Sequence, residues 1–444
     1  MKYIRAWSAR SKRLVTSSGR SRPSSQNIQA SPEARISETP RFTRPPGSTL
    51  SSLFPELIDE IVTYLDDDRE SLRYCALISP VWACSVQRLL FRTLTIFPKS
   101  PDGFVPFLRF LESSPHIRVH IRSLTLNGCF LFDNNHICSH LLSRILAILP
   151  PLRFLKLHCT HFTHAACLSS GIGSLCDSQN HIDHNGGAHN PNGVSTDPPR
   201  FKVDHLRLDL TDTKNDNIDE FLDILELFSD VRIFEVFRDS RFPFTDWTET
   251  SLDPPIFFVQ QLRSIGVPPL LGILHSSIAT HSLHTIDLSL ECIADIDSLG
   301  ALLVAVGPNI RYLRLNPTRL LSIFPPVATE HWKHLGISMC TRLQHFELMM
   351  YRGSHCYCRK HLGSILDILA SVPTSTTKLT LHIHQRFRKY LDWSLIEQTL
   401  LHLSLDRVVL DPWVLKKTEE GTECFGETYL PKLYAKGLLT AGSD

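Results

Sequence analysis

The sequence lacks any long apolar run and any excess of charge of one sign. Its longest apolar stretch, about Leu299 to Val306, falls far short of the roughly 18 residues that cross a bilayer. Across 444 residues, 46 Lys and Arg face 45 Asp and Glu, which leaves a net charge of +1. A nearly neutral chain gives no reason to expect a nucleic acid or an acidic membrane as partner. We therefore expect a soluble protein that binds neither.

Paired cysteine spacing is also missing. Twelve cysteines are scattered along the chain, and several, such as Cys75, Cys138 and Cys340, lie inside apolar patterns. This usage is typical of reduced thiols in an intracellular protein. Residues 1–20 carry charges where a secretory signal has its apolar core, so we expect a cytoplasmic or nuclear location.

Motifs of catalysis and of metal binding are scarce. The sequence holds no G-x-x-x-x-G-K-[ST] loop, no G-x-S-x-G turn, no H-E-x-x-H helix and no H-x-E with a C-x-x-C partner. Zinc-ligand residue types gather in two places: His355, Cys356, Cys358 and His361, and His158, Cys159, His161 and His164. The cysteines of the first group are one residue apart instead of the usual two, and 22 histidines make the second group unremarkable. We expect no enzymatic activity, no cofactor and no metal.

Residues 1–49 form a basic, serine-rich tail. They contain ten Lys and Arg, ten Ser and only two acids. Such a segment cannot offset the entropy of folding, so we expect it to be disordered. Its Arg-rich, acid-poor start also leaves mitochondrial targeting by residues 1–25 open.

Residues 50–97 contain three short helical patterns. The first runs from Leu57 to Leu65 after Pro55, the second follows the acidic residues 66–68, and the third begins at Pro80. A strand at residues 91–96 ends the segment. A helical unit this small buries too little surface to be stable alone, so we expect it to pack on a neighbour or a partner.

This segment resembles an F-box, the helical module that docks F-box proteins onto a Skp-family adaptor of cullin-RING ubiquitin ligases. The resemblance is carried by Leu53-Phe-Pro-Glu-Leu57, Ile61, Leu65, residues 72–77, Trp82 and Leu90-Phe91. The acidic spacer at residues 66–70 and the exit at residues 90–94 are similar to those of F-box proteins from filamentous fungi. One residue departs from the family: Phe54 follows the first leucine, where proline is usual, and Pro55 comes one place later.

The resemblance implies a Skp-family adaptor, and through it a cullin, as partners. It also implies an adaptor-facing apolar patch, which seven residues form or support: Leu53, Pro55, Leu57, Ile58, Ile61, Leu72 and Trp82.

Residues 98–411 carry a repeated pattern of apolar-x-x-apolar-x-apolar. It starts at Ile121, Leu152, Val203, Val231, Leu262, Leu283, Ile310, Leu343, Thr376 and Leu400. Helical patterns lie between the copies, and a Gly-, Asn- and His-rich insertion at residues 165–199 reads as a mobile loop. Strand, turn and helix at this spacing predict an α/β repeat, an irregular solenoid that resembles leucine-rich repeats. A doubly wound α/β sheet is the alternative, disfavoured because no glycine-rich phosphate turn occurs. Residues 412–444 would cap the last repeat and end in a tail.

Arginine recurs at the second position of this pattern, as Arg122, Arg153, Arg232, Arg263 and Arg311. Equal positions of a solenoid stack side by side, so these residues should form a band that suits an acidic or phosphorylated protein target. Acids on the same strands, Asp204, Glu235, Asp287 and Glu347, offer the plainer alternative that the arginines are neutralised within the protein.

Two functions therefore remain open. The chain is either the substrate-recognition subunit of a Skp-cullin-F-box ubiquitin ligase or a leucine-rich-repeat interaction scaffold without a ubiquitin role. Capture of the adaptor separates the two.

Overall fold

The structure is a computed structural model. It describes residues 53–98, 103–128, 136–158, 160–162, 200–209, 218–237, 256–265, 268–279, 281–320, 329–350, 362–383, 391–410 and 425–441. The predicted tail at residues 1–49, the insertion at residues 165–199 and the His and Cys group at residues 355–361 lie outside the described residues.

One parallel sheet of 12 strands runs through the molecule. Its strands are ordered in space as they are in the sequence, so each strand lies beside the sheet strand that follows it in the chain. Its strands are β1 (Thr93–Ile96), β2 (Ser123–Asn127), β4 (Phe154–His158), β6 (Phe201–Asp209), β7 (Phe228–Phe237), β8 (Phe258–Ile265), β9 (Thr285–Ser289), β10 (Tyr312–Asn316), β11 (His345–Met350), β12 (Lys378–Ile383), β13 (Arg407–Leu410) and β14 (Leu439–Ala441). A separate pair joins β3 (His136–Ile137) to β5 (His161–Phe162). Sequential parallel pairing of this kind is the topology of an α/β solenoid, as the repeated pattern predicts.

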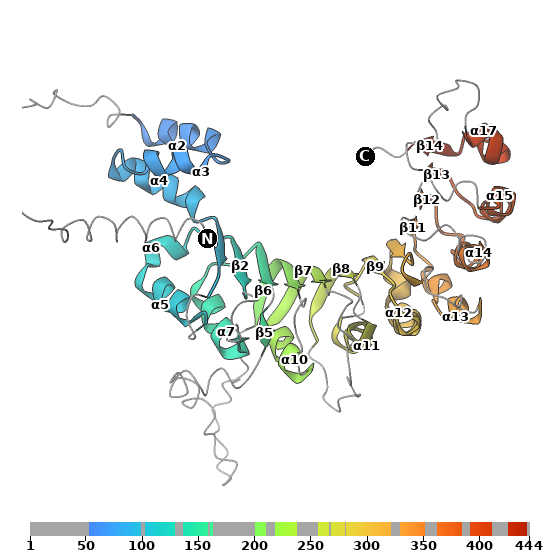
Figure 1. The fold of residues 1–444 in the computed structure, drawn as a ribbon, viewed down its shortest axis with the longest axis horizontal. Coiled ribbons are helices and arrows are strands. Elements are labelled where there is room, and N and C mark those ends of the chain that lie inside the picture. The colour runs from blue at the N-terminus through green and yellow to red at the C-terminus, as the bar shows by residue number, and fades with distance from the viewer. Residues whose placement is uncertain are drawn as a thin grey trace, which may run out of the picture.

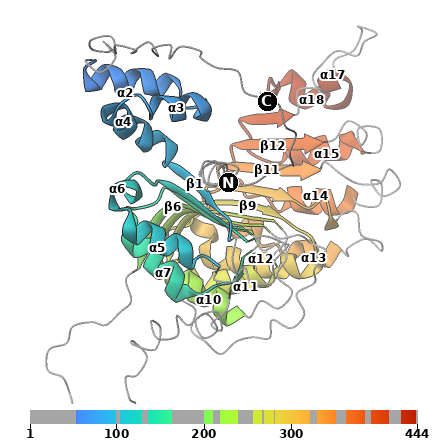
Figure 2. The ribbon, with the colours of Figure 1, turned by 60° about the vertical axis from the view of Figure 1, so that its left-hand side comes forward.

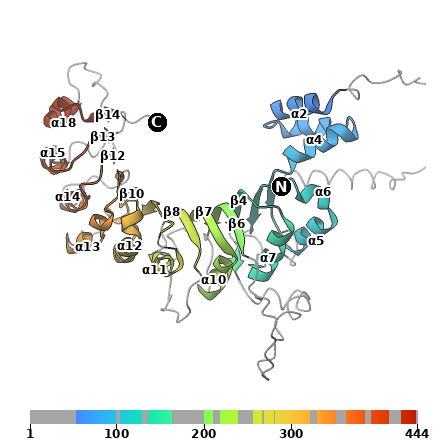
Figure 3. The same ribbon diagram turned by 180° about the vertical axis from the view of Figure 1, so that it is seen from behind.

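Helices return the chain from the end of one strand to the start of the next. They are α5 (Val105–Ser113), α6 (Pro115–Arg118), α7 (Ser139–Ile148), α10 (Ile218–Glu226), α11 (Pro268–Ser277), α12 (Ile293–Val306), α13 (Thr329–Lys333), α14 (Leu362–Ala370), α15 (Trp393–Leu401), α17 (Phe425–Tyr429) and α18 (Pro431–Ala435), with 3-10 turns η2 (Gly307–Asn309) and η4 (Ile337–Met339). Figures 1 and 3 show an arc with the strands on its concave side and the helices on its convex side. None of the described helices is both long and apolar enough to cross a membrane.

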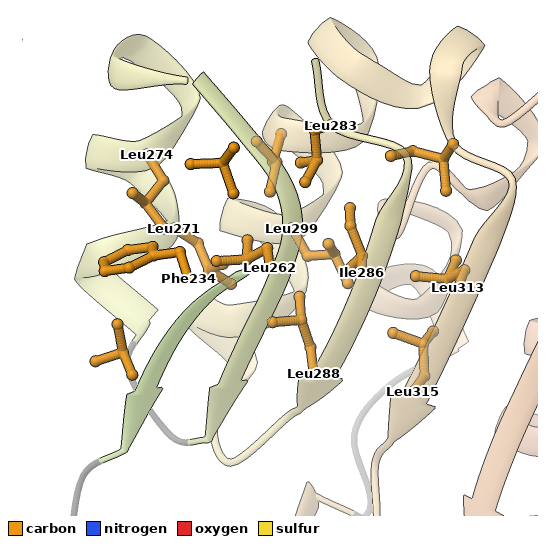
Figure 4. Close-up of a cluster of buried hydrophobic side chains, with 14 of the residues drawn as sticks. Phe234, Leu262, Leu271, Leu274, Leu283, Ile286, Leu288, Leu299, Leu313 and Leu315 are labelled. Atoms are coloured by element: carbon orange, nitrogen blue, oxygen red, sulfur yellow. The ribbon is translucent and has the colours of Figure 1, made fainter. Parts of the chain in front are cut away.

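The apolar positions of the pattern build the core. Leu262, Ile286 and Leu313 lie in register on neighbouring strands and are fully buried. They point toward the helices, where Leu271 and Leu299 pack against them (Figure 4). Because side chains alternate along a strand, the polar residues between them face the concave side.

Two of the expected repeat starts are wrong. The copy placed at Leu262 begins instead at Val259, because Val259 pairs with Val231 and Leu262 pairs with Phe234. The copy placed at Leu400 lies in helix α15, and strand β13 aligns Val408 with Leu379 of β12, so this repeat begins at Leu405. Both sites contain more than one apolar residue at suitable spacing, and only pairing with the neighbouring strand selects among them.

Three helices occupy the N-terminal segment as the pattern predicts: α2 (Pro55–Tyr64), α3 (Arg69–Cys75) and α4 (Pro80–Leu90). Asp68 caps α3 by accepting hydrogen bonds from the amides of Glu70 and Ser71, and Ser79 caps α4. We call residues 53–90 the helical module. It stands at one end of the arc (Figure 2), and only residues 91 and 92 separate it from β1, the edge strand of the large sheet. We call the described residues between 91 and 441 the solenoid.

Candidate protein-binding surfaces

Helix α2 of the helical module is apolar on two faces. One face carries Ile58 and Val62, which are 1% exposed and pack in the module's own core. The other carries Leu57 and Ile61, which are 45% and 41% exposed. With Phe54 and Tyr64 they follow one another at helical spacing, so they form a continuous stripe, which we call the α2 stripe. Contiguous exposed apolar side chains are a common feature of protein–protein interaction surfaces.

The seven residues implied by the F-box resemblance divide between the surface and the core. Pro55, Leu57 and Ile61 are exposed. Leu53 is partly buried against the core, whereas Ile58, Leu72 and Trp82 are buried within it. These last three residues therefore support the surface and do not themselves reach a partner.

A second apolar surface was not among the residues predicted from sequence. Leu77 is 81% exposed at the turn between α3 and α4, and Ile78 and Val81 beside it are also exposed. Their spacing fits a buried helix face equally well, so only the placement of α3 against α4 reveals that they face solvent.

The concave face of the solenoid has a central row of side chains, one from each of the ten successive sheet strands from β1 to β12. Its members are Thr95, Thr125, Lys156, Arg207, Glu235, Arg263, Asp287, Arg314, Glu347 and Thr380. Charges alternate along its middle, and neighbours pair: Nη1 of Arg207 lies 3.4 Å from Glu235, and Arg314 lies 3.3 Å from Asp287 and 2.9 Å from Glu347. The charges in the middle of this row are therefore neutralised by ion pairs between side chains on adjacent strands.

Glu347 is the centre of this network. The Tyr312 hydroxyl donates to it at 2.6 Å, and Nε2 of His382 lies 2.7 Å away. Burial raises the pKa of Glu347, but the hydrogen bonds from His382 and Tyr312 and the charge of Arg314 outweigh burial and lower the pKa to about 2. Burial, and then the charge of Lys378, lowers the pKa of the neighbouring His345 to about 4. These contacts hold the Glu347 carboxylate in its charged form.

A second row lies toward the amino-terminal edge of the sheet, and each member from Arg92 to Thr377 comes three residues before the central-row residue of the same repeat. This entrance row consists of Arg92, Arg122, Arg153, Asp204, Arg232, Gln260, His284, Arg311, Gln344, Thr377 and Asp406. Four of the five predicted arginines belong to it. Arg263 does not, because the corrected register places it in the central row between Glu235 and Asp287. Gln260 takes its place in the entrance row.

The predicted neutralising acids do pair with arginines. Arg232 lies 3.9 Å from Asp204, in an exposed pair, and Glu235, Asp287 and Glu347 pair along the central row as described. The predicted band is therefore broken after Arg153 by Asp204, which sits between Arg153 and Arg232 in the entrance row.

Arg122 and Arg153 line a cavity of about 320 Å³ where the helical module meets the first strands of the solenoid. Arg69 of α3 and Arg92 also line it, together with Asp66. We call it the junction cavity.

One group of metal-ligand residue types comes together among the described residues. Asp297 of α12, His331 of α13 and His334, which follows α13, have ligand atoms within 4.8 Å of one another. Nδ1 of His334 lies 3.3 Å from Asp297, and both side chains are more than half exposed, as in an ordinary surface pair. From the second group considered in the sequence, His158 instead pairs with Asp209 at 2.7 Å.

Comparisons with known proteins bear on the fold. No protein-family model matches the chain, and no similar curated protein is found. Among solved structures, the chain is similar to the leucine-rich repeat-containing protein LegL7 of Legionella pneumophila, with 15% identity and a TM-score of 0.37 over 74% of this chain and 85% of that chain. The sheet topology described above is what establishes the solenoid.

Proposed function

We propose that this chain is the substrate-recognition subunit of a Skp-cullin-F-box ubiquitin ligase. In this proposal the helical module binds a Skp-family adaptor and the solenoid binds the target protein. The ligase chemistry resides in other subunits. Extended concave faces of solenoids are protein-binding surfaces, so the fold suits an interaction protein.

The α2 stripe is the observation that carries the proposal. A module with five buried core residues would gain stability by turning more of its apolar side chains inward, yet α2 leaves Leu57 and Ile61 uncovered. This arrangement is explained if an adaptor covers them. The F-box resemblance of residues 53–91 independently suggests the same partner.

Substitution of the α2 stripe tests this half of the proposal. We expect Leu57→Ala combined with Ile61→Ala to weaken capture of a Skp-family adaptor about thirtyfold, because truncating buried interface anchors costs on the order of 2 kcal/mol or more. Both side chains are exposed in the free chain, so its thermal unfolding should hardly change. The measurement is titration calorimetry of the full chain with purified adaptor.

Val304 of α12 and Leu395 of α15 supply a matched control, since they are also exposed apolar side chains but lie on the solenoid. The double variant Val304→Ala and Leu395→Ala should bind the adaptor normally. If the wild-type chain shows no affinity for the adaptor, the chain is an interaction scaffold without a ubiquitin role.

A further inference from the structure

Four arginines converge on the junction cavity from different parts of the chain. Arg69 begins α3, Arg92 follows α4, and Arg122 and Arg153 precede β2 and β4. The amide of Arg122 donates to the carbonyl of Arg92 at 2.9 Å, and the amide of Arg153 donates to that of Arg122 at 2.8 Å. Three arginines therefore start from adjacent strands, which lie about 4.8 Å apart. Their guanidinium groups line the same cavity, where like charges repel and an anion placed among them would be attracted.

The cavity contains little charge to offset them. Asp66 is the acid in its lining, and its carboxylate is 4.0 Å from Arg92 with both side chains about half exposed. A pair of this kind is weak. Arg69 donates to the carbonyl of Thr93 at 3.4 Å, which fixes its direction without neutralising it. Nearby, burial and then the charges of Arg88 and Arg122 lower the pKa of His120, in line with a positive local potential.

The remainder of the entrance row is different. Beyond Arg153, Asp204 faces Arg232 at 3.9 Å, and the next two members are Gln260 and His284. Excess positive charge is thus concentrated where the solenoid meets the helical module.

We propose that the junction cavity binds the phosphate group of a phosphorylated segment of a target protein. Guanidinium groups bind phosphate oxygens through paired, charge-assisted hydrogen bonds, and several arginines around one phosphate are a recurring mode of phosphopeptide recognition. The volume of about 320 Å³ leaves room beside a phosphate for the side chain that carries it, and Leu72 and Leu89 form apolar parts of the wall. The site lies at the start of the entrance row, and a segment bound there can continue over the adjoining strands β4 and β6. This inference deepens the target-binding half of the proposed function and rests on it.

Binding of three degenerate peptide pools to the full chain tests the inference. The pools are identical except for a central phosphoserine, serine or glutamate. We expect the phosphoserine pool to bind most tightly, and Arg122→Ser with Arg153→Ser to weaken it at least about tenfold, since each lost charge-assisted hydrogen bond is strong. Asp66→Asn should strengthen binding because it removes a competing carboxylate. Arg311→Ser, an exposed member of the same row far along the sheet, should leave binding unchanged.

A pH series identifies the charged group. A phosphate loses its second charge near pH 6, so affinity for the phosphoserine pool should fall between pH 7 and pH 5, with no comparable fall for the glutamate pool. Equal binding of all three pools overturns the proposal, as does an equal loss in Arg311→Ser. Free phosphoserine bound as tightly as the peptides, or an RNA oligonucleotide bound more tightly, overturns the assignment to a protein segment.

Adaptor capture by the same variants separates this inference from the proposed function. The Arg122→Ser and Arg153→Ser variant should still bind a Skp-family adaptor, because neither residue belongs to the α2 stripe. If the wild-type chain binds the adaptor but not the phosphopeptides, only the proposal about the junction cavity is wrong. Phosphopeptide binding without adaptor capture in the wild-type chain removes the ligase assignment alone.

Discussion

The solenoid and the helical module differ in how completely they bury their apolar side chains. In the solenoid these side chains form one continuous core from Phe104 to Leu433, because each repeat covers the next. The helical module has a separate core of five buried residues, and several large apolar side chains outside it remain exposed. The solenoid presents charges that are largely paired on its concave face, whereas the module presents uncovered apolar surface. This difference in apolar burial is the observation on which the proposed adaptor-binding role of the module rests.

The largest expected effect comes from the core of the module. Trp82 is 4% exposed and is the largest of its five buried side chains. We expect Trp82→Ala to cost about 3–5 kcal/mol of the free energy of unfolding and to open the module while the solenoid stays folded. Hydrogen exchange should show lost protection in residues 55–90 only.

Trp332→Ala supplies the control, since Trp332 is also buried but lies in α13 of the solenoid. That variant should lose protection around α12 and α13 and keep it in the module. Equal loss throughout the chain in either variant would show that the two regions fold as one unit and would break the comparison.

Acid should affect the solenoid before the module. The pKa of His345 is lowered to about 4, so the folded protein resists a proton that the unfolded chain accepts below pH 6.5, and stability falls as pH drops from 6.5 toward 4. The pKa of Glu347 is lowered to about 2, so its stabilising effect is present above pH 4.5 and is lost as pH falls toward 2. In the module, hydrogen bonding from Ser71 lowers the pKa of Asp68 from 3.8, so its stabilising effect is lost only below pH 3.8, well under the range in which His345 acts.

Urea unfolding at pH 7.5, 6 and 5 measures the first of these steps. We expect the free energy of unfolding of the solenoid to fall by on the order of 1–3 kcal/mol across this range. His345→Gln should flatten the fall because it removes the titrating group, while hydrogen exchange in α2–α4 should change little. A steeper acid response in the module than in the solenoid would contradict the comparison.

The sequence predicts the solenoid well because a period of strand and helix depends on residue type alone. It predicts register poorly where several apolar residues compete, as at Val259 and Leu262, since the choice depends on pairing with the neighbouring strand β7. Because the repeat start was misplaced at Leu262, the sequence predicted Arg263 in the row of Arg122 and Arg153, whereas it lies in the central row. Gly300 lies so close to the carbonyl of His334 that a Cβ has no room there. The residues around Gly300 in the sequence do not reveal this contact. Charge pairing along the central row and the junction cavity both depend on which strands are neighbours.

The smallest expected effect concerns exposed ion pairs, which occur in both regions. Asp59 and Arg88 lie 3.5 Å apart in the module, and Glu112 and Arg144 lie 2.8 Å apart on the helices of the solenoid. All four side chains are more than 40% exposed. Solvent screens such pairs, so double-mutant cycles with alanine should give coupling energies of ~0–1 kcal/mol for both, and 0.5 M salt should reduce them further.

Equal and small values would locate the difference between the regions in apolar burial and in the concave-face network, not in surface charge. A coupling above about 2 kcal/mol for Asp59 and Arg88 alone would instead show that the module is stabilised by its charges. The module would then be stable without a partner in spite of its exposed α2 stripe. The inference that an adaptor covers the stripe would lose its physical basis.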